Sequence, residues 1–150
     1  MIFWPALTLS MVPNTSAKAQ KQGDLRPILQ PPRQNAEHYI ERAVELADLS
    51  LKRGDGTGYG AVVVKDGMIV GEGRNRTFLT NDPTAHSEID AIRDACHRLD
   101  THTLKDSEIY CSARPCQMCE TACYWARLSR IHFKSTGANI VSIEPRYARC

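Results

Sequence analysis

Residues 60–73 read GAVVVKDGMIVGEG, and this stretch decides the fold that the sequence predicts. Two runs rich in β-branched residues flank the pair Asp66-Gly67. An Asp-Gly pair suits a two-residue turn because both turn positions adopt positive φ. The stretch therefore predicts two antiparallel strands joined by a tight hairpin.

Helical patterns lie on both sides of this hairpin. Apolar residues recur at helical spacing over 36–51, and Gly54 is the stop signal of that helix. After the hairpin, Asp-Pro-Thr at 82–84 supplies an N-cap and a first-turn proline for a second helix, whose apolar stripe covers 85–99. A third helix is expected over 115–128.

Short strands are expected at 109–111, 131–133 and 139–143, in addition to the hairpin. The order α-β-β-α-β-α-β predicts one α/β domain, a three-layer α/β/α sandwich with a central mixed sheet of about five strands.

The composition is that of a soluble globular domain. The chain has 150 residues, 42% of them hydrophobic and 24% charged, which is enough for one core. Nineteen Lys and Arg residues against seventeen Asp and Glu residues leave a net charge of only +2. A nucleic-acid partner is therefore possible but not favoured.

The first 34 residues differ from the rest. An apolar run over 2–12 is too short to span a bilayer as a helix, and Ala-Lys-Ala at 17–19 resembles a secretory cleavage site. Against export, Pro5 interrupts the run and no basic residue precedes it. We expect a signal-like segment and Pro-rich linker at 1–34 and the folded domain at 35–150, with cytoplasmic and exported locations both open.

Three residues have the spacing of a metal site. Cys116 and Cys119 are three residues apart at the start of an expected helix, which places both thiols on one face. The helix N-terminus favours their thiolate forms. His86 completes a His-Cys-Cys set that suits zinc and leaves the fourth tetrahedral position open, as in catalytic sites.

Glu88 lies two residues beyond His86, in the same first helical turn. It can reach a zinc-activated water without binding the ion, and can take up and pass on its proton. Two other interpretations stay open: a redox dithiol, and a structural zinc that recruits Cys111 or Cys123. We expect Cys123 and Cys96 to be small buried apolar residues.

These motifs resemble the cytidine and deoxycytidylate deaminase superfamily, and within it bacterial guanine deaminases. The combination of His-x-Glu with Pro-Cys-x-x-Cys is the zinc-deaminase signature. The resemblance covers residues 36–134. The matching stretches are GAVVVKDG at 60–67, NDPTAHSE at 81–88, AIR at 91–93, PCQMC at 115–119 and YWAR at 124–127.

The resemblance implies hydrolytic deamination of a nucleobase or a related aminated heterocycle, with guanine as the first candidate. It assigns His86, Cys116 and Cys119 as zinc ligands and Glu88 as the proton shuttle. Asn75 matches a residue that hydrogen-bonds the substrate ring, and the backbone at Ser87 matches a position that contacts the base. Members of this kind are commonly homodimers, so a homodimer is expected.

The sequence departs from the family pattern near the site. Ser87 and Arg114 stand where Ala and Glu are usual, and Arg114 reverses a charge next to the site. The segment 136–139 lacks an acidic residue expected in a lid. Tyr147 is a candidate lid aromatic, although an ordinary surface tyrosine is the favoured interpretation.

Two alternatives to a nucleobase deaminase remain. A tRNA adenosine deaminase requires a basic track for the RNA backbone, and a zinc-stabilised binding module without turnover has no use for Glu88. The arginines available for such a track are Arg74, Arg76, Arg114, Arg127, Arg130, Arg146 and Arg149.

Overall fold

The computed structural model describes residues 26–137 and 139–146. Its centre is a five-stranded sheet with strand order β2-β1-β3-β4-β5. Within this part of the chain β3 and β4 pair parallel, whereas the other neighbours pair antiparallel. The strands are β1 (Gly60–Lys65), β2 (Met68–Arg74), β3 (Ser107–Cys111), β4 (Arg130–Lys134) and β5 (Ile140–Ile143).

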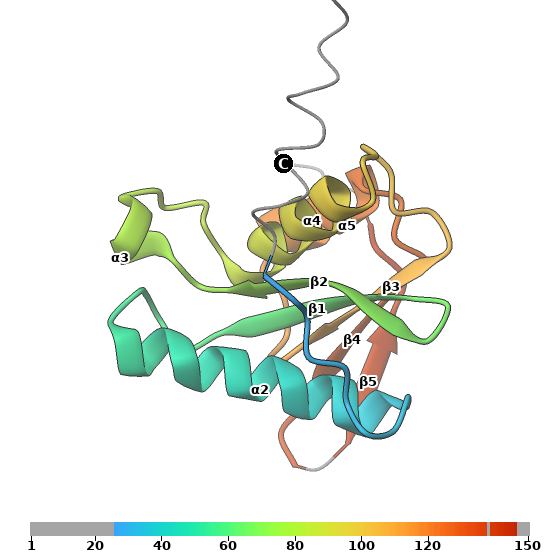
Figure 1. Cartoon of the computed structure of the whole chain (residues 1–150), viewed down its shortest axis with the longest axis horizontal. Helices are drawn as coiled ribbons and strands as arrows, with labels where there is room; N and C mark the ends of the chain where they lie inside the picture. Colours follow the sequence, from blue (N-terminus) through green and yellow to red (C-terminus); the bar gives the residue numbers. More distant parts are fainter. Residues whose placement is uncertain (1–25, 138, 147–150) are drawn as a thin grey trace, which may run out of the picture.

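Helices cover both faces of the sheet. α2 (Ala36–Arg53) lies on one face, and α4 (Ser87–Arg98) and α5 (Gln117–Trp125) lie on the other, whereas the short α3 (Thr77–Thr80) extends beyond the sheet (Figure 1). The predicted three-layer α/β/α sandwich with a mixed sheet is therefore confirmed.

The turn and stop signals have the predicted geometry. Asp66 and Gly67 both have positive φ, 50° and 77°, in the β1–β2 turn. Gly54 caps α2 in the left-handed conformation with φ 66°, and its N–H donates to the Leu51 and Ser50 carbonyls. Local turn chemistry was therefore a sound guide to where these elements end.

The central strands are buried on both faces. Val63, like Ile109 and Ile131, belongs to the core beneath α4 and α5, whereas Val62 and Val64 pack with α2 residues in a second core. Successive side chains of a strand point to opposite faces. A sheet covered on both sides therefore requires the unbroken apolar run of β1.

A close approach of α4 to β2 fixes the position of the α4 N-terminus. A Cβ atom at Gly73 would clash with the Ser87 carbonyl, and one at Gly71 would clash with the Ala91 carbonyl. These glycines let the helix backbone lie directly against the strand. The start of α4 is thereby held beside Asn75, at the end of β2.

The second predicted helix begins later than expected. Asp82 does not cap it, because its side chain accepts hydrogen bonds from the Thr84 N–H and hydroxyl, at 2.8 and 2.7 Å, and closes a separate turn. α4 begins at Ser87, and His86 is its N-cap residue with extended backbone. The expectation that His86 lies within the first helical turn was therefore wrong.

The third predicted helix is shorter at both ends. Cys116 is the N-cap residue of α5 and has extended backbone, so it does not share a helical face with Cys119. At the other end the helix stops at Trp125, and Arg127 takes a positive φ of 62°. The left-handed turn at a residue other than glycine gave no signal in the sequence.

Residues before α2 contact the edge of the sheet. The Gln30 side-chain amide donates to the Ile69 carbonyl and accepts from the Ile69 N–H, both at 2.8 Å, and Ile28 packs against the second core. The signal-like stretch itself lies outside the described residues, and the boundary at 34/35 stays a prediction. Within the part of the chain that the structure describes, no helix is long and apolar enough to cross a membrane.

Candidate metal centre and active site

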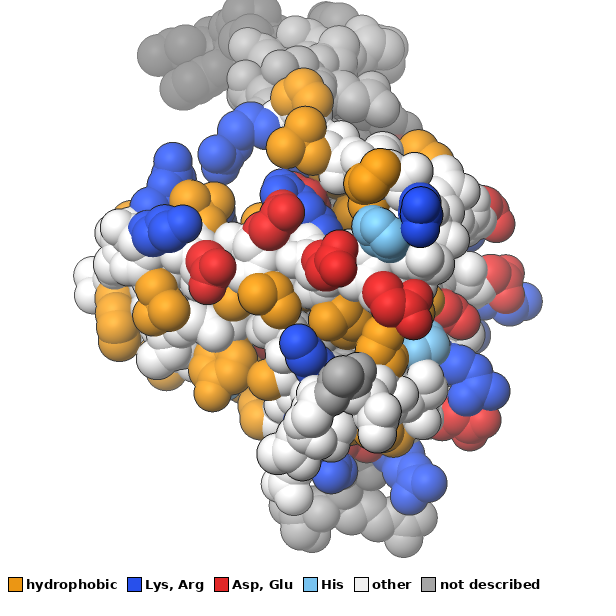
Figure 2. All heavy atoms as spheres, turned by 90° about the horizontal axis from the view of Figure 1, so that it is seen from below, with side chains coloured by type: hydrophobic (Ala, Val, Ile, Leu, Met, Phe, Trp, Pro, Cys, Tyr) orange, Lys and Arg blue, Asp and Glu red, His pale blue; other side chains and the backbone are white. Residues whose placement is uncertain are grey.

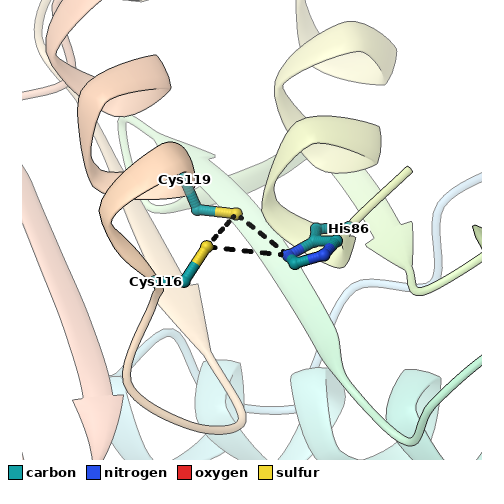
Figure 3. A group of neighbouring side chains, drawn as sticks. All are labelled: His86, Cys116 and Cys119. Atoms are coloured by element: carbon teal, nitrogen blue, oxygen red, sulfur yellow. Dashed lines mark hydrogen bonds between the residues drawn. The ribbon is translucent and has the colours of Figure 1, made fainter. Parts of the chain in front are cut away.

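Three side chains converge at the N-terminal ends of α4 and α5 (Figure 3). His86 Nδ1 lies 3.7 Å from Cys116 Sγ and 3.6 Å from Cys119 Sγ, and the two sulfur atoms are 3.6 Å apart. The sequence predicted that these residues form one metal site, and in the structure their possible ligand atoms all lie within 4.8 Å of one another.

The three donor atoms fit a zinc ion. Zinc–sulfur bonds of about 2.3 Å and zinc–nitrogen bonds of about 2.0–2.1 Å in a tetrahedron place neighbouring ligand atoms about 3.5–3.8 Å apart. The observed separations fall in this range. Among the described residues no fourth His, Cys, Asp or Glu joins the group, so the chain supplies three ligands, the number found in catalytic zinc sites.

The other cysteines in the described part of the chain do not belong to this group. Cys111 and Cys123 are buried in the core beneath α4 and α5, and Cys96 packs against it. Burial raises the pKa of all three thiols. Neutral buried thiols behave as small apolar side chains, as expected for Cys123, whereas Cys96 is only partly buried.

The surroundings of the Cys119 thiol shift its pKa upward. Burial is the first cause that raises its pKa, and the neighbouring Glu88 carboxylate and Cys116 add to the effect. The partial positive charge at the N-terminus of α5 acts in the opposite direction and favours the thiolate, and a coordinated dication deprotonates a thiol.

Glu88 lies in the first turn of α4, one residue beyond the helix start. Only 7% of it is exposed, and its carboxylate is close enough to raise the pKa of Cys119, Cys111 and Cys123. The Ser87 hydroxyl donates to Glu88 Oε2 at 2.9 Å. The carboxylate is thus held beside the metal-binding group without belonging to it.

The Asn75 side chain has a fixed orientation at the end of β2. Asn75 is 2% exposed. Its Oδ1 accepts from the Thr57 N–H at 3.3 Å, the Thr77 N–H at 3.2 Å and the Thr77 hydroxyl at 2.8 Å. Because three donors point at Oδ1, the amide group at Nδ2 faces the other way.

The Asn75 backbone is held equally firmly. Its N–H donates to the Tyr59 carbonyl at 2.9 Å, and its carbonyl accepts from the Ser50 hydroxyl at 2.7 Å. Sequence reasoning did not find Ser50, Thr57 or Thr77, because isolated polar residues in a loop or at a helix end give no periodic pattern.

The described arginines that were available for a basic track lie on separate segments, in line with the interpretation of scattered surface residues. Arg74 and Arg76 are paired with Asp55 and Asp90. Arg114 is exposed, and its guanidinium lies 6.0 Å from the centre of the Phe133 ring. Arg127, Arg130 and Arg146 are exposed on other segments, and Tyr147 and Arg149 lie outside the described residues.

Fold and site together define a class: an α/β sandwich with a three-ligand zinc site at two helix N-termini and a buried glutamate beside it. The comparisons agree. The chain matches the model of the cytidine and deoxycytidylate deaminase zinc-binding region over residues 33–135. The chain belongs to this family.

Relatives in this family include guanine and tRNA deaminases. A guanine deaminase of Bacillus subtilis is 46% identical over 99 residues, which are 66% of this chain and 64% of that protein. A tRNA-specific adenosine deaminase of Aquifex aeolicus is 34% identical over 99 residues, which are 66% of this chain and 65% of that protein. The matched part thus covers less than two thirds of either relative.

Solved structures share the fold. The crystal structure of the B. subtilis guanine deaminase superposes with a TM-score of 0.65 over 67% of this chain and 64% of that one. A guanine deaminase from Nitrosomonas europaea, 27% identical, gives a TM-score of 0.61 over 84% of this chain and 68% of that one.

Proposed function

We propose that the protein is a zinc-dependent hydrolytic deaminase of a nucleobase or a related aminated heterocycle, with guanine as the first candidate. The observation that carries the proposal is the buried Glu88 carboxylate beside a metal-binding group that supplies only three ligands. Guanine comes first because the Bacillus relative named for it shares 46% of the aligned residues.

The proposed chemistry uses Glu88 as the proton carrier. His86, Cys116 and Cys119 would hold zinc, which supplies the Lewis acid that makes water nucleophilic near neutral pH. Glu88 takes a proton from the attacking water, passes it to a ring nitrogen, and assists proton transfer to the leaving amine. The overall reaction replaces the exocyclic amine by a carbonyl and releases ammonia.

Asn75 and Ser87 would bind and orient the ring. The Asn75 amide donates from a position fixed by the Thr77 contacts, which suits an acceptor atom of the heterocycle. The Ser87 backbone lies next to Glu88 at the start of α4, where it can contact the base. Ring and proton carrier are thereby placed by two neighbouring segments, the end of β2 and the start of α4.

A panel of amines tests the substrate class. Zinc-loaded protein is incubated with guanine, adenine, cytosine, their nucleosides, a pterin and a tRNA, and ammonia release is followed. We expect turnover of guanine that Glu88→Ala abolishes. Turnover of another amine that depends on Glu88 would keep the chemistry and correct the substrate, and Arg114 would then be the first residue to exchange.

The second candidate is deamination of adenosine in tRNA. It is kept because tRNA-specific adenosine deaminases reach 38% identity with this chain. Release of ammonia from the tRNA but not from free bases would establish it. A zinc-stabilised module without turnover would instead fold with zinc and release no ammonia from any amine in the panel.

The assembly is proposed to be a homodimer, as the family resemblance implies. Sedimentation of the zinc-loaded protein measures this directly. A mass of one chain across the accessible concentration range would contradict it.

A further inference from the structure

A cavity of about 590 Å³ lies along the outer edge of β2, between α2 and α4, and Arg26, Pro27 and Leu29 form part of its wall. Seen from the side of α2, Lys and Arg side chains gather around a hollow at the upper left of the molecule (Figure 2). Six arginines line the cavity: Arg26, Arg42, Arg74, Arg76, Arg93 and Arg98.

The three carboxylates of the cavity wall are already engaged. Asp94 accepts from the Glu72 N–H at 2.9 Å, and Asp90 accepts from the Arg74 N–H at 3.4 Å. Glu72 is bound by two donors of Arg42, at 2.7 and 3.2 Å. Asp90 and Asp94 also pair with Arg76 and Arg98. The three acids thus bind the β2 edge and three arginines, so they are not open ligands for a cation.

Two arginines of the cavity, Arg74 and Arg98, are each anchored through Nε. Arg74 donates through Nε to Asp55 at 2.6 Å, and Arg98 donates through Nε to Asp94 at 2.8 Å. Their described contacts do not use the terminal amino groups. A guanidinium fixed at Nε loses little further freedom on binding an anion, and its planar fork matches phosphate oxygens.

The rim adds positive charge that the wall does not balance. Arg93 is 60% exposed, and its nearest described carboxylate is Asp82 at 4.0 Å, outside the cavity. The carboxylate that pairs with Arg74, Asp55, also lies outside the lining residues. Among the lining residues, six guanidinium groups face three carboxylates, and Asp55 and Glu45 pair with Arg74 and Arg42 from outside the lining.

We propose that this cavity binds the phosphate group of a small organic phosphate. The anchored arginines would hold the phosphate oxygens by charge-assisted hydrogen bonds. Pro27, Leu29, Leu46 and Leu49 form an apolar part of the wall that suits the body of such a ligand. The volume falls in the range of small-molecule sites, of about 300–1,000 Å³.

The proposed site is separate from the metal centre. Neither the three metal-binding residues nor Glu88 line the cavity. Its occupancy is measured as binding, whereas the proposed function is measured as ammonia release, so either can fail without the other.

Calorimetric titration of the zinc-loaded full chain tests the site, with guanosine 5′-monophosphate as probe and guanosine as the matched ligand without phosphate. We expect the monophosphate to bind and guanosine to bind at least tenfold more weakly. Arg93→Ala and Arg98→Ala should each weaken binding of the monophosphate about tenfold. Lys134→Ala, which removes one positive charge at the end of β4, should change it less than twofold.

Four results would overturn the proposal. These are no heat of binding at millimolar monophosphate, equal binding of guanosine, an equal loss in Lys134→Ala, or binding of a short RNA oligonucleotide with none of the monophosphate. Thermal unfolding of each variant is recorded in parallel. Arg98→Ala can lower Tm because Asp94 loses its partner. In that case binding by Arg93→Ala, which changes a largely exposed residue, decides the test.

Discussion

The Ser87 hydroxyl donates a 2.9 Å hydrogen bond to Oε2 of Glu88, the next residue along α4, and both residues are buried. The contact fixes one oxygen of the carboxylate. A hydrogen bond to a charged group contributes about 1.5–3 kcal/mol. The proposed proton carrier is therefore held in place from within its own helix.

Removing this hydroxyl should slow turnover without loss of zinc. We expect Ser87→Ala to lower kcat about tenfold, which corresponds to about 1.4 kcal/mol, because the carboxylate gains other orientations. Steady-state kinetics and zinc content measure the two effects. Ser135→Ala, between β4 and β5, is the control, and an unchanged kcat in Ser87→Ala would show that the contact does not orient the carboxylate.

The orientation of Asn75 makes a separate prediction. Thr77→Val removes the 2.8 Å donor to Asn75 Oδ1 and leaves only the two backbone donors at 3.2 and 3.3 Å, so the amide is held less firmly. KM should rise about tenfold with a smaller change in kcat, since about 1–1.5 kcal/mol of hydrogen bonding is lost. Thr80→Val on the same short helix removes only a bond to the Arg76 carbonyl and should leave KM unchanged.

Removal of the metal should destabilise the fold. Binding that favours the folded state adds about 4 kcal/mol when free zinc exceeds its Kd a thousandfold, so a strong chelator should lower Tm. Cys119→Ser should lose most of its zinc, whereas Cys96→Ser should keep one zinc per chain. Retention of zinc in Cys119→Ser would point to a different ligand set.

The features that the sequence predicted are local in the chain. The Asp66-Gly67 hairpin, the Gly54 stop and the Cys116–Cys119 spacing each depend on a few neighbouring residues, and His86 was added to the pair by its residue type. The start of α4 was missed because the Asp82 side chain bonds Thr84 in a turn of its own, and the same residue types serve equally well as a helix cap.

The features that the sequence did not predict join distant segments. Thr57 meets Asn75 only because the loop after α2 folds against the end of β2, and the arginine cavity gathers residues from the N-terminal segment, α2, β2 and α4. Such contacts leave no periodic pattern in one sequence. The metal ligands were found because their type and spacing are themselves the signal.

His132 makes stability depend on pH. Burial lowers its pKa from the ordinary 6.5, although the Glu108 carboxylate at 3.1 Å acts in the opposite direction. As the pH falls below 6.5, the unfolded chain takes up a proton that the folded protein resists, so the free energy of unfolding decreases.

His132→Phe can keep the stacking on Tyr110, where the ring planes lie 9° apart, and removes the titration. Urea unfolding at pH 7 and pH 5 should show a smaller loss of stability in this variant than in the wild type. The difference should not exceed about 1.4 kcal/mol per pH unit. An equal loss in both proteins would assign the pH dependence to other groups.

The most direct test of the proposed function compares zinc-loaded wild type with Glu88→Gln, which keeps the shape of the side chain and removes its capacity to carry a proton. Zinc content and ammonia release from guanine are measured on the same samples. We predict one zinc per chain in both proteins and a loss of at least a hundredfold in the rate for Glu88→Gln, in line with the usual contribution of general acid–base catalysis. An unchanged rate in Glu88→Gln would contradict the account.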